Sequence, residues 1–388
     1  MFPYREDPHR AEGPWQGVPF RLYAMNRILV ANIFGIGDVL FTTPLISSLK
    51  RKMPGLSVDY LCNARARGMV KFIPDVDDIY VYEKDDLASL WRSSKPACLK
   101  RSWEIFSALR DKKYDAVFDF TLSRKFGFFL MLAGIRRRIG LDYKKRGTFL
   151  TDKTAFTGFE QRHVIEHYLD LLEHAGVEPS VRELGLVPDE NALERADRFL
   201  GEKGVGEGDL VAVMPGGGAS WGPMAPRKRW SAGGFARVAD ILTEKGYKVL
   251  ILGDRSETGL CEDTVRMMKE KCALVENGLE IEEYIAVLAR CGLAVCNDGG
   301  PLHVAVALGL RTVSIFGPVD EKVYGPYPPS EKHVVMTAKE LGCRPCYGRF
   351  RLPECSNDLR CLGNIEPGKV ANACLKLLGR KDVYTDVK

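Results

Sequence analysis

The chain has 388 residues, of which 45% are hydrophobic and 28% are charged, a soluble globular balance whose length favours about two domains. The net charge of +5 excludes histone-like behaviour but leaves room for one basic face that meets an acidic substrate. The longest apolar stretch, residues 126–135, is too short for a membrane span, which needs about 20 residues.

The first 26 residues are predicted to form an extension. Their sequence "MFPYREDPHRAEGPWQ" is polar where a signal peptide would be apolar, so we expect a cytoplasmic protein, with peripheral contact to a membrane surface left open. From there strands alternate with helices, which predicts a parallel sheet covered on both faces. The predicted elements are the strands "NRILVANIF" (26–34), "SVDYLC", "IYVYE" and "YDAVFDF", and helices over 39–54 and 163–176.

The pattern loosens over residues 177–190, where we place a boundary between domains of residues 27–185 and 186–365. A second alternation follows, with the predicted strands "LVAVM", "YKVLILG", "CALVE", "LAVCN" and "RTVSIFG". The last helix, 367–379 within the segment 366–388, is expected to pack back on the first domain. Two doubly wound domains in tandem leave a cleft at the carboxyl ends of their strands, where ligands bind.

Three glycine-rich or polar turns follow strands of the second domain: "VMPGGGASWG" (213–222), "LGDRSET" (252–258) and "NDGGPLH" (297–303). Glycines allow a close backbone approach to a ligand, and the N–H groups at a helix start favour phosphate. The candidate anion-binding residues in these turns are Gly216, Gly217, Gly299, Gly300 and His303. Lys228, in the loop "MAPRKRWS" (224–231), is either solvated or lies over a diphosphate. Tight turns and a structural histidine are the alternative, but three turns on one sheet edge favour an anion site.

In the first domain, "NIFGIGDVLFTTP" (32–44) holds half of the dinucleotide fingerprint G-x-G-x-x-G, with Leu40 at its third glycine position. Asp38 starts the next helix, either as its cap or as a general base that faces the cleft. Basic residues after predicted strands are either solvated or bind an acidic acceptor. The candidates for the acceptor are Arg65, Arg67, Arg124 and Lys125. Aromatic residues are not interleaved with these basic residues in the pattern that is typical of nucleic-acid binding.

Two further patterns are weaker. Asp75 and Asp77 in "PDVDD" (74–78) have the D-x-D spacing of some metal-dependent transferases, but an acidic surface turn is the favoured interpretation. Cys343, Cys346, Cys355 and Cys361 cluster near the C-terminus with only one tight C-x-x-C pair. Zinc, disulfides and free thiols all stay open there, with thiols favoured. The segment lies past the last cleft motif, so we expect it to be structural.

Taken together, these motifs resemble glycosyltransferase family 9, the ADP-heptose:lipopolysaccharide heptosyltransferases, from about residue 26 to 379. "GIGDVLFTTPLISSLKRKMP" is similar to the family's opening segment, "PRKRWSAGGFARVADIL" to its K-R-W-P segment, and "NDGGPLHVAVALG" to its D-[ST]-G-x-x-H segment. The Cys-rich tail also looks like tails in that family. Two departures are Gly299 in place of the usual Ser or Thr and Ser231 in place of Pro.

The resemblance implies a GT-B fold, with two Rossmann-like domains around a central cleft, and an inverting transfer without metal or cofactor. Asp38 would be the general base, and Lys228 would bind the phosphates of an ADP-heptose donor. The diphosphate and sugar would be held by Asp298, Gly299, Gly300 and His303, and the nucleoside by Glu257. The acceptor would be an acidic, lipid-linked glycan of the lipopolysaccharide core at the cytoplasmic face of the inner membrane.

Two rival functions stay in view. One is an NAD-linked oxidoreductase, which Leu40 and the absence of an acidic residue after a clear second strand disfavour. The other is a nucleotide-sugar-binding protein without catalysis, which the joint presence of Asp38, Lys228 and His303 disfavours.

Overall fold

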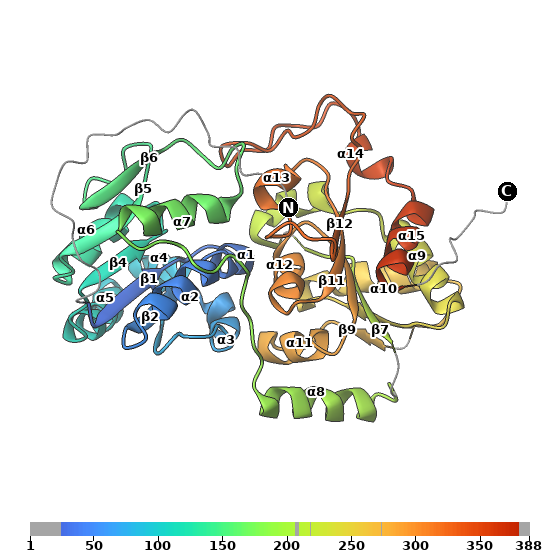
Figure 1. Ribbon diagram of the computed structural model, residues 1–388, viewed down its shortest axis with the longest axis horizontal. Helices are drawn as coiled ribbons and strands as arrows, with labels where there is room; N and C mark the ends of the chain where they lie inside the picture. Colours follow the sequence, from blue (N-terminus) through green and yellow to red (C-terminus); the bar gives the residue numbers. More distant parts are fainter. Residues whose placement is uncertain (1–24, 206–208, 218, 273, 380–388) are drawn as a thin grey trace.

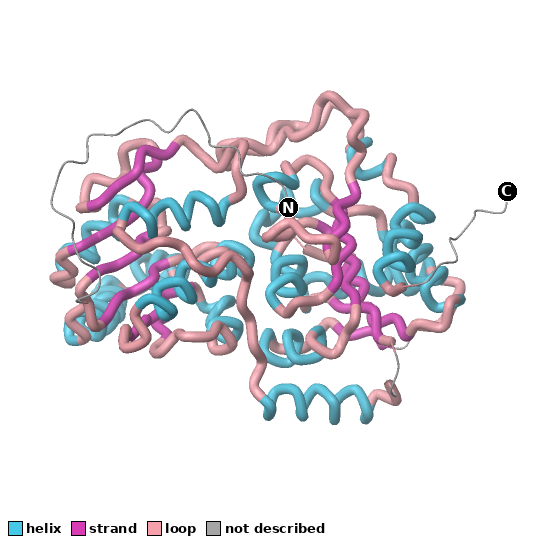
Figure 2. The backbone as a smooth tube through the Cα atoms, viewed as in Figure 1, coloured by secondary structure: helices cyan, strands magenta, loops and turns pink. Residues whose placement is uncertain are grey.

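The computed structural model describes residues 25–205, 209–217, 219–272 and 274–379. Most of the predicted extension therefore lies outside the described residues. The rest forms two halves, each a six-stranded parallel sheet with helices on both faces (Figures 1 and 2). The predicted fold, two Rossmann-like domains in the GT-B arrangement, is confirmed. Within the described chain, no helix has both the length and the apolar character that a bilayer span requires.

The N-terminal sheet has the strand order β3-β2-β1-β4-β5-β6, and all its pairings are parallel. Its strands are β1 (Arg27–Ala31), β2 (Ser57–Cys62), β3 (Ile79–Val81), β4 (Ala116–Asp119), β5 (Arg137–Tyr143) and β6 (Asp152–Phe156). Its helices are α1 (Ile36–Leu40), α2 (Thr43–Lys52), α3 (Arg67–Val70), α4 (Lys84–Ser93), α5 (Lys95–Asp111), α6 (Arg124–Leu132) and α7 (Val164–His174).

The predicted helix over 39–54 is two helices, α1 and α2. Pro44 has no N–H to donate to the carbonyl of Leu40, four residues earlier, so a continuous helix would lose that hydrogen bond. The hydroxyl of Thr43 donates to the Leu40 carbonyl instead, at 2.8 Å. The break turns α1 into a short helix of its own at the carboxyl end of β1.

The C-terminal sheet has the order β12-β11-β10-β7-β8-β9. Its strands are β7 (Leu210–Met214), β8 (Lys248–Leu252), β9 (Leu274–Glu276), β10 (Leu293–Asn297), β11 (Arg311–Ile315) and β12 (His333–Met336). Its helices are α8 (Glu190–Glu202), α9 (Ala232–Glu244), α10 (Thr258–Met267), α11 (Ile281–Leu288), α12 (Gly300–Ala307), α13 (Glu321–Tyr324), α14 (Arg360–Gly363) and α15 (Pro367–Leu377). The central strands β7 and β10 are buried along their whole length, as apolar strands of a doubly covered parallel sheet should be.

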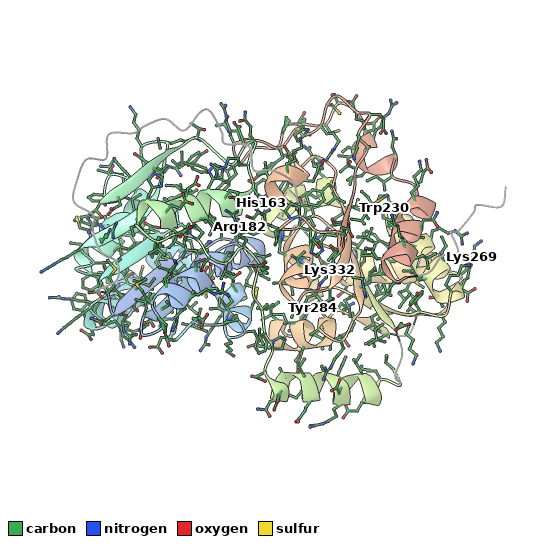
Figure 3. All side chains as sticks on the ribbon, in the orientation of Figure 1. His163, Arg182, Trp230, Lys269, Tyr284 and Lys332 are labelled. Carbon is green, nitrogen blue, oxygen red and sulfur yellow. The ribbon has the colours of Figure 1, made fainter. Side chains whose placement is uncertain are left out.

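The chain crosses between the halves just before α8. The Val187 amide still donates to the Phe72 carbonyl of the N-terminal half at 2.8 Å, whereas α8 packs on α11 of the C-terminal half. Helices α1 and α12, one from each half, contact each other where the sheets meet. His163, which caps α7, adds a hydrogen bond of 3.0 Å between its Nε2 and the Gly325 carbonyl at the junction of the halves (Figure 3).

The expectation that the last helix packs on the first domain is wrong. Helix α15 packs against α9, β10 and β11, and Val370 and Cys374 belong to the core of the C-terminal half (Figure 1). An amphipathic pattern shows that a helix needs an apolar surface but not which surface it takes. Cys361 and Leu362 of α14 are buried in the same core, and the short turn to Pro367 keeps α15 beside them.

Candidate functional site

One large cleft, about 2090 Å³ in volume, lies between the halves at the carboxyl ends of their strands. Its walls include Asp38 after β1, Thr121 after β4, Gly217 after β7, Asp254 after β8 and Asp298 after β10. The three glycine-rich or polar turns of the C-terminal half follow β7, β8 and β10, which are neighbours in the sheet. The structure therefore brings these turns and the Asp38 segment to one cavity.

Asp38 is both a cap and a wall residue of the cleft. Its Oδ2 accepts the Gly35 N–H at 3.2 Å, and the side chain is half-buried. Burial raises the pKa of Asp38 from 3.8 to about 6, and the positive charge of Lys228 opposes that rise. Capping and cleft lining were alternatives in the sequence, and the structure shows both together. The group is poised to exchange a proton near neutral pH.

Lys228 and Asp298 form a buried ion pair on the opposite wall. The Lys228 Nζ lies 2.6 Å from the Asp298 Oδ2, and the two side chains are 6% and 5% exposed. Nζ also lies 4.2 Å from the centroid of the Trp221 ring, a distance that gives a cation–π contact. The Lys228 ammonium is thus held in place by a carboxylate and an aromatic face while it lines the cleft.

His303 lies in α12 and is buried at the contact between the halves. Its ring packs edge-on against Phe41, with centroids 4.5 Å apart. Burial, together with the smaller effects of His163 and Lys228, lowers its pKa to about 3, so the imidazole is neutral. Its Nδ1 is buried and has no hydrogen-bond partner among the described residues. A neutral ring still carries one N–H donor that can serve a ligand.

Gly37 allows this contact between the halves. A Cβ on Gly37 would lie only 2.7 Å from the Cδ2 of His303. A side chain there would push α1 away from α12, and with it Asp38 away from the opposite wall. In the sequence, Gly37 was interpreted as one glycine of an incomplete dinucleotide fingerprint. In the structure, it allows α1 to pack closely against α12.

Glu257 holds the β7 and β8 turns together. Its Oε1 accepts the Gly217 N–H at 2.6 Å and an Arg229 N–H at 3.2 Å, and its Oε2 accepts the Asp254 N–H at 3.3 Å. Gly216 is buried and is not among the residues that line the cleft, so its role in donor binding stays a prediction. A Cβ on Gly216 would lie 2.1 Å from the Glu257 carboxylate, so its glycine makes room for this side chain.

Asn297 and Arg229 are residues that the sequence reasoning missed. The Asn297 Nδ2 donates to the Pro215 and Gly216 carbonyls at 2.8 and 2.9 Å, and its Oδ1 accepts the Trp230 N–H at 2.8 Å. A polar residue at the end of the otherwise apolar strand "LAVCN" was the signal that could have found it. Arg229 donates to the Gly217 carbonyl as well as to Glu257, so both residues fix the β7 turn.

Three of the four predicted acceptor-binding residues, Arg65, Arg124 and Lys125, line the N-terminal wall of the cleft. Arg67 is not among the residues that line this cleft, and its role in acceptor binding stays a prediction. It begins α3, which packs on α11, and its charge lies near Glu282. Burial acts to raise the pKa of that carboxyl, but Lys71 and, to a smaller extent, Arg67 lower it overall. Although Arg67 is only two residues from Arg65, it lies at the start of a new helix beside this contact.

The cysteine segment is closer to the site than expected. Cys343, Cys346, Cys355 and Cys361 are free thiols that line one small cavity. In the described part of the chain, no group of three or more His, Cys, Asp or Glu side chains is placed to hold a metal ion. Tyr347, Phe350 and Leu352 of the same segment line the main cleft, and the Tyr347 ring lies 4.6 Å from that of Trp221. The segment therefore contributes to the cleft wall although it follows the last motif that predicted the cleft, and its structural role stays a prediction.

The D-x-D motif is a surface turn, as the favoured interpretation had it. Asp75 and Asp77 are exposed, and Asp77 accepts the Val58 N–H at 2.7 Å and pairs with Lys50 at 3.3 Å. The turn lies at the amino end of β3, away from the edge that forms the cleft.

Comparison with known proteins agrees with this geometry. The family model described as glycosyltransferase family 9 (heptosyltransferase) matches residues 102–353. The chain is 24% identical to lipopolysaccharide heptosyltransferase 3 of Escherichia coli, over 75% of this chain and 83% of that protein. The structure is similar to a glycosyl transferase family 9 protein from Veillonella parvula, with TM-score 0.75, 24% identity and coverage of 91% and 97%. It is also similar to E. coli ADP-heptose lps heptosyltransferase II, with TM-score 0.72, 20% identity and coverage of 91% and 98%.

Proposed function

Because the chain belongs to glycosyltransferase family 9 and is a glycosyltransferase, we propose that it moves a heptose from ADP-heptose to a lipopolysaccharide core. The transfer would invert the anomeric carbon and need no metal ion. The names of its relatives support the donor and the acceptor: one E. coli protein of similar fold is named for ADP-heptose, and an E. coli relative is a lipopolysaccharide heptosyltransferase.

One observation carries the proposal. Asp38 on one wall of the cleft faces the buried Lys228–Asp298 pair on the other, close enough for both charges to shift its pKa. A base and an anion-binding cation on opposite walls are the two groups that transfer from a nucleoside diphosphate requires. The leaving diphosphate needs charge stabilisation, and the acceptor hydroxyl must lose its proton.

We assign the donor to the C-terminal wall. Lys228 would bind the diphosphate as a charge-assisted donor, with its ammonium shared between the phosphates and Asp298. The N–H groups of Gly299 and Gly300 at the start of α12 and the ring N–H of His303 would add neutral donors. These groups together can balance the charge that a metal ion balances in other transferases. Glu257 is a positioning residue in this account, because its oxygens hold the turn that would meet the nucleoside.

We assign the acceptor to the N-terminal wall. Arg65, Arg124 and Lys125 would hold acidic groups of the glycan and direct a hydroxyl toward Asp38. Asp38 would take the proton as the hydroxyl oxygen bonds to the anomeric carbon and the diphosphate leaves toward Lys228. The base and the leaving group then lie on opposite faces of the sugar, and this geometry inverts the configuration.

Product analysis tests the proposal. The purified protein is incubated with a panel of ADP-sugars and UDP-sugars and a lipopolysaccharide-core acceptor, with a chelator present. Released nucleotide is quantified, and the anomeric configuration of the product is read by NMR. We expect transfer from ADP-heptose with inversion. Retention of configuration, an absolute need for a divalent ion, or nucleotide-sugar binding without any transfer would each contradict a named part of the proposal.

A further inference from the structure

Helices α4, α5 and α6 carry an exposed apolar surface that the transfer chemistry does not use. Nine large apolar side chains are exposed among the described residues, and five of them lie on these three helices. They are Trp91, Leu99, Trp103, Phe128 and Leu132. Leu99 and Trp103 are 61% and 62% exposed, a high value for side chains of this size. We name these five residues the apolar patch.

The two helices that carry most of the patch, α5 and α6, contact each other through aromatic side chains. Leu99 and Trp103 are four residues apart in α5, and Phe128 and Leu132 are four apart in α6, so each pair shares one helix face. Tilted and edge-on ring contacts join the two helices: the centroids of Trp103 and Phe106 are 5.2 Å apart. Those of Phe106 and Phe129 are 5.7 Å apart. Figure 1 places α5 and α6 together at the end of the N-terminal half that lies farthest from the C-terminal half.

Basic residues lie among the patch residues of α4 and α5 and form its basic border. The segment from Trp91 to Trp103 contains four basic residues, Arg92, Lys95, Lys100 and Arg101, and no acidic residue. Of these four, Arg101 alone forms a salt bridge with a described residue, Glu104. The Lys95 Nζ lies 5.7 Å from the Trp91 ring centroid. Tryptophan and leucine among exposed lysine and arginine are the composition of surfaces that lie in the interface of an anionic membrane.

The same helices also form the acceptor end of the cleft. Ser102 and Ile105 of α5 and Phe126 and Phe129 of α6 line the cavity that contains Asp38. One side of each helix therefore faces the site, and another side carries the apolar patch. A lipid-linked acceptor whose sugar reaches Asp38 would leave the cleft beside these helices.

We propose that the apolar patch and its basic border dock the protein on an anionic lipid bilayer, so that the acceptor presents its glycan without leaving the membrane. The orientation toward the acceptor rests on the proposed function, whereas the docking itself does not. The patch would enter the headgroup region, and Lys95 and Lys100 would face lipid phosphates. An acidic protein would match the charges but would not explain two exposed tryptophans beside a cleft for a lipid-linked substrate.

Vesicle flotation of the full chain tests the docking, without donor or acceptor. Vesicles of phosphatidylcholine alone are compared with vesicles that also contain phosphatidylglycerol, at low and high salt. We expect binding to the anionic vesicles that weakens with salt. Leu99→Ser with Trp103→Ser should lower the partition coefficient at least tenfold, because burying two large apolar side chains exceeds the 1.4 kcal/mol of a factor of ten.

A second variant addresses the charges. Lys95→Gln with Lys100→Gln should lower binding about fivefold for each charge removed, as expected for about 1 kcal/mol per basic residue at an anionic surface. The matched control is Val187→Ser with Met267→Ser, which removes two exposed apolar side chains elsewhere and should leave binding unchanged. All variants should keep their melting temperature and their transfer rate to a deacylated acceptor, which separates docking from catalysis.

Several results would overturn the docking proposal. One is a failure of the full chain to bind anionic vesicles at all. Another is a control variant that loses as much binding as the Leu99 and Trp103 variant does. A change from dimer to monomer in the Leu99 and Trp103 variant would show that a second copy covers the patch. Binding that arises only after removal of residues 1–24 would show that the chain's own extension covers it.

Discussion

Replacing Asp38 by Asn should stabilise the protein at neutral pH, although it removes the group proposed to act as the base. Burial raises the pKa of Asp38 from 3.8 to about 6. The ionised carboxylate therefore lowers the free energy of unfolding of the protein. A difference of about 2 pKa units corresponds to about 3 kcal/mol, and the half-buried position lowers this to about 1–3 kcal/mol. The Asn side chain can still accept the Gly35 N–H, so the cap is retained.

The gain should depend on pH in a defined direction. Above pH 6 Asp38 is charged in both the folded and the unfolded state, and the folded state carries the full cost of burial. Between pH 6 and pH 3.8 the folded state takes up the proton first, so the cost disappears as pH falls. The advantage of Asp38→Asn should therefore be largest near pH 7.5 and close to zero at pH 4.

Thermal unfolding at pH 7.5, 5 and 4 measures this difference. Each kcal/mol corresponds to about 2–4 °C in a domain of 150–250 residues. The matched control is Asp189→Asn, because Asp189 is an exposed cap of α8 that accepts the Ala192 N–H at 2.7 Å and has no buried charge to remove. If Asp38→Asn is less stable than the parent at pH 7.5, Asp38 is an ordinary favourable cap and the reasoning is refuted.

Three further predictions concern the site. The value of kcat/KM should fall about tenfold from pH 7 to pH 5, as the ionised fraction of Asp38 falls through a pKa of about 6, whereas a flat pH–rate profile over that range would contradict this. Lys228→Ala should weaken ADP binding by about 1.5–3 kcal/mol in calorimetry with a chelator present; binding that survives this change but requires a divalent ion would point to a metal site instead. Changing the four cysteines of Cys343–Cys361 to Ser should lower the melting temperature more than it lowers donor affinity, and one equivalent of zinc in the purified protein would show that the thiols ligate a metal.

Much of the fold was predictable because the strands have strong local signals. The buried strands β7 and β10 are short apolar runs between turns, and such runs in alternation with amphipathic helices define a doubly covered parallel sheet. Strands β5, β6 and β12 were not predicted. Strand β6 is half exposed and polar, and β5 begins in a basic run, so neither shows an uninterrupted apolar signal.

The position of the candidate site was predictable, but its contacts were not. Glycine-rich and polar turns after strands indicated an anion-binding edge, and the cleft of the structure contains all three. The sequence could not show that the Glu257 carboxylate accepts hydrogen bonds from the backbone of two turns. It also could not show that Gly37 makes room for His303. Such contacts join residues far apart in the chain, and only the packed structure fixes them.

The differences between expectation and structure share this cause. Helix α15 was assigned to the wrong half because an amphipathic stripe does not specify its partner surface. Arg67 was grouped with Arg65 by sequence proximity, although a new helix begins there and faces α11. Tyr347 and Phe350 were overlooked because their segment follows the last recognised motif, and it folds back over the cleft beside Trp221.

The central claim is that Asp38 is the base and that the opposite wall binds the donor. Single-turnover transfer and donor affinity, measured side by side for the parent and for Asp38→Asn, test it most directly. The account predicts that the rate falls by about 10²–10⁴-fold while affinity for the nucleotide-sugar stays within about threefold, since the donor phosphates contact the other half. A variant that folds and turns over at the parent rate would contradict the account and place the base elsewhere.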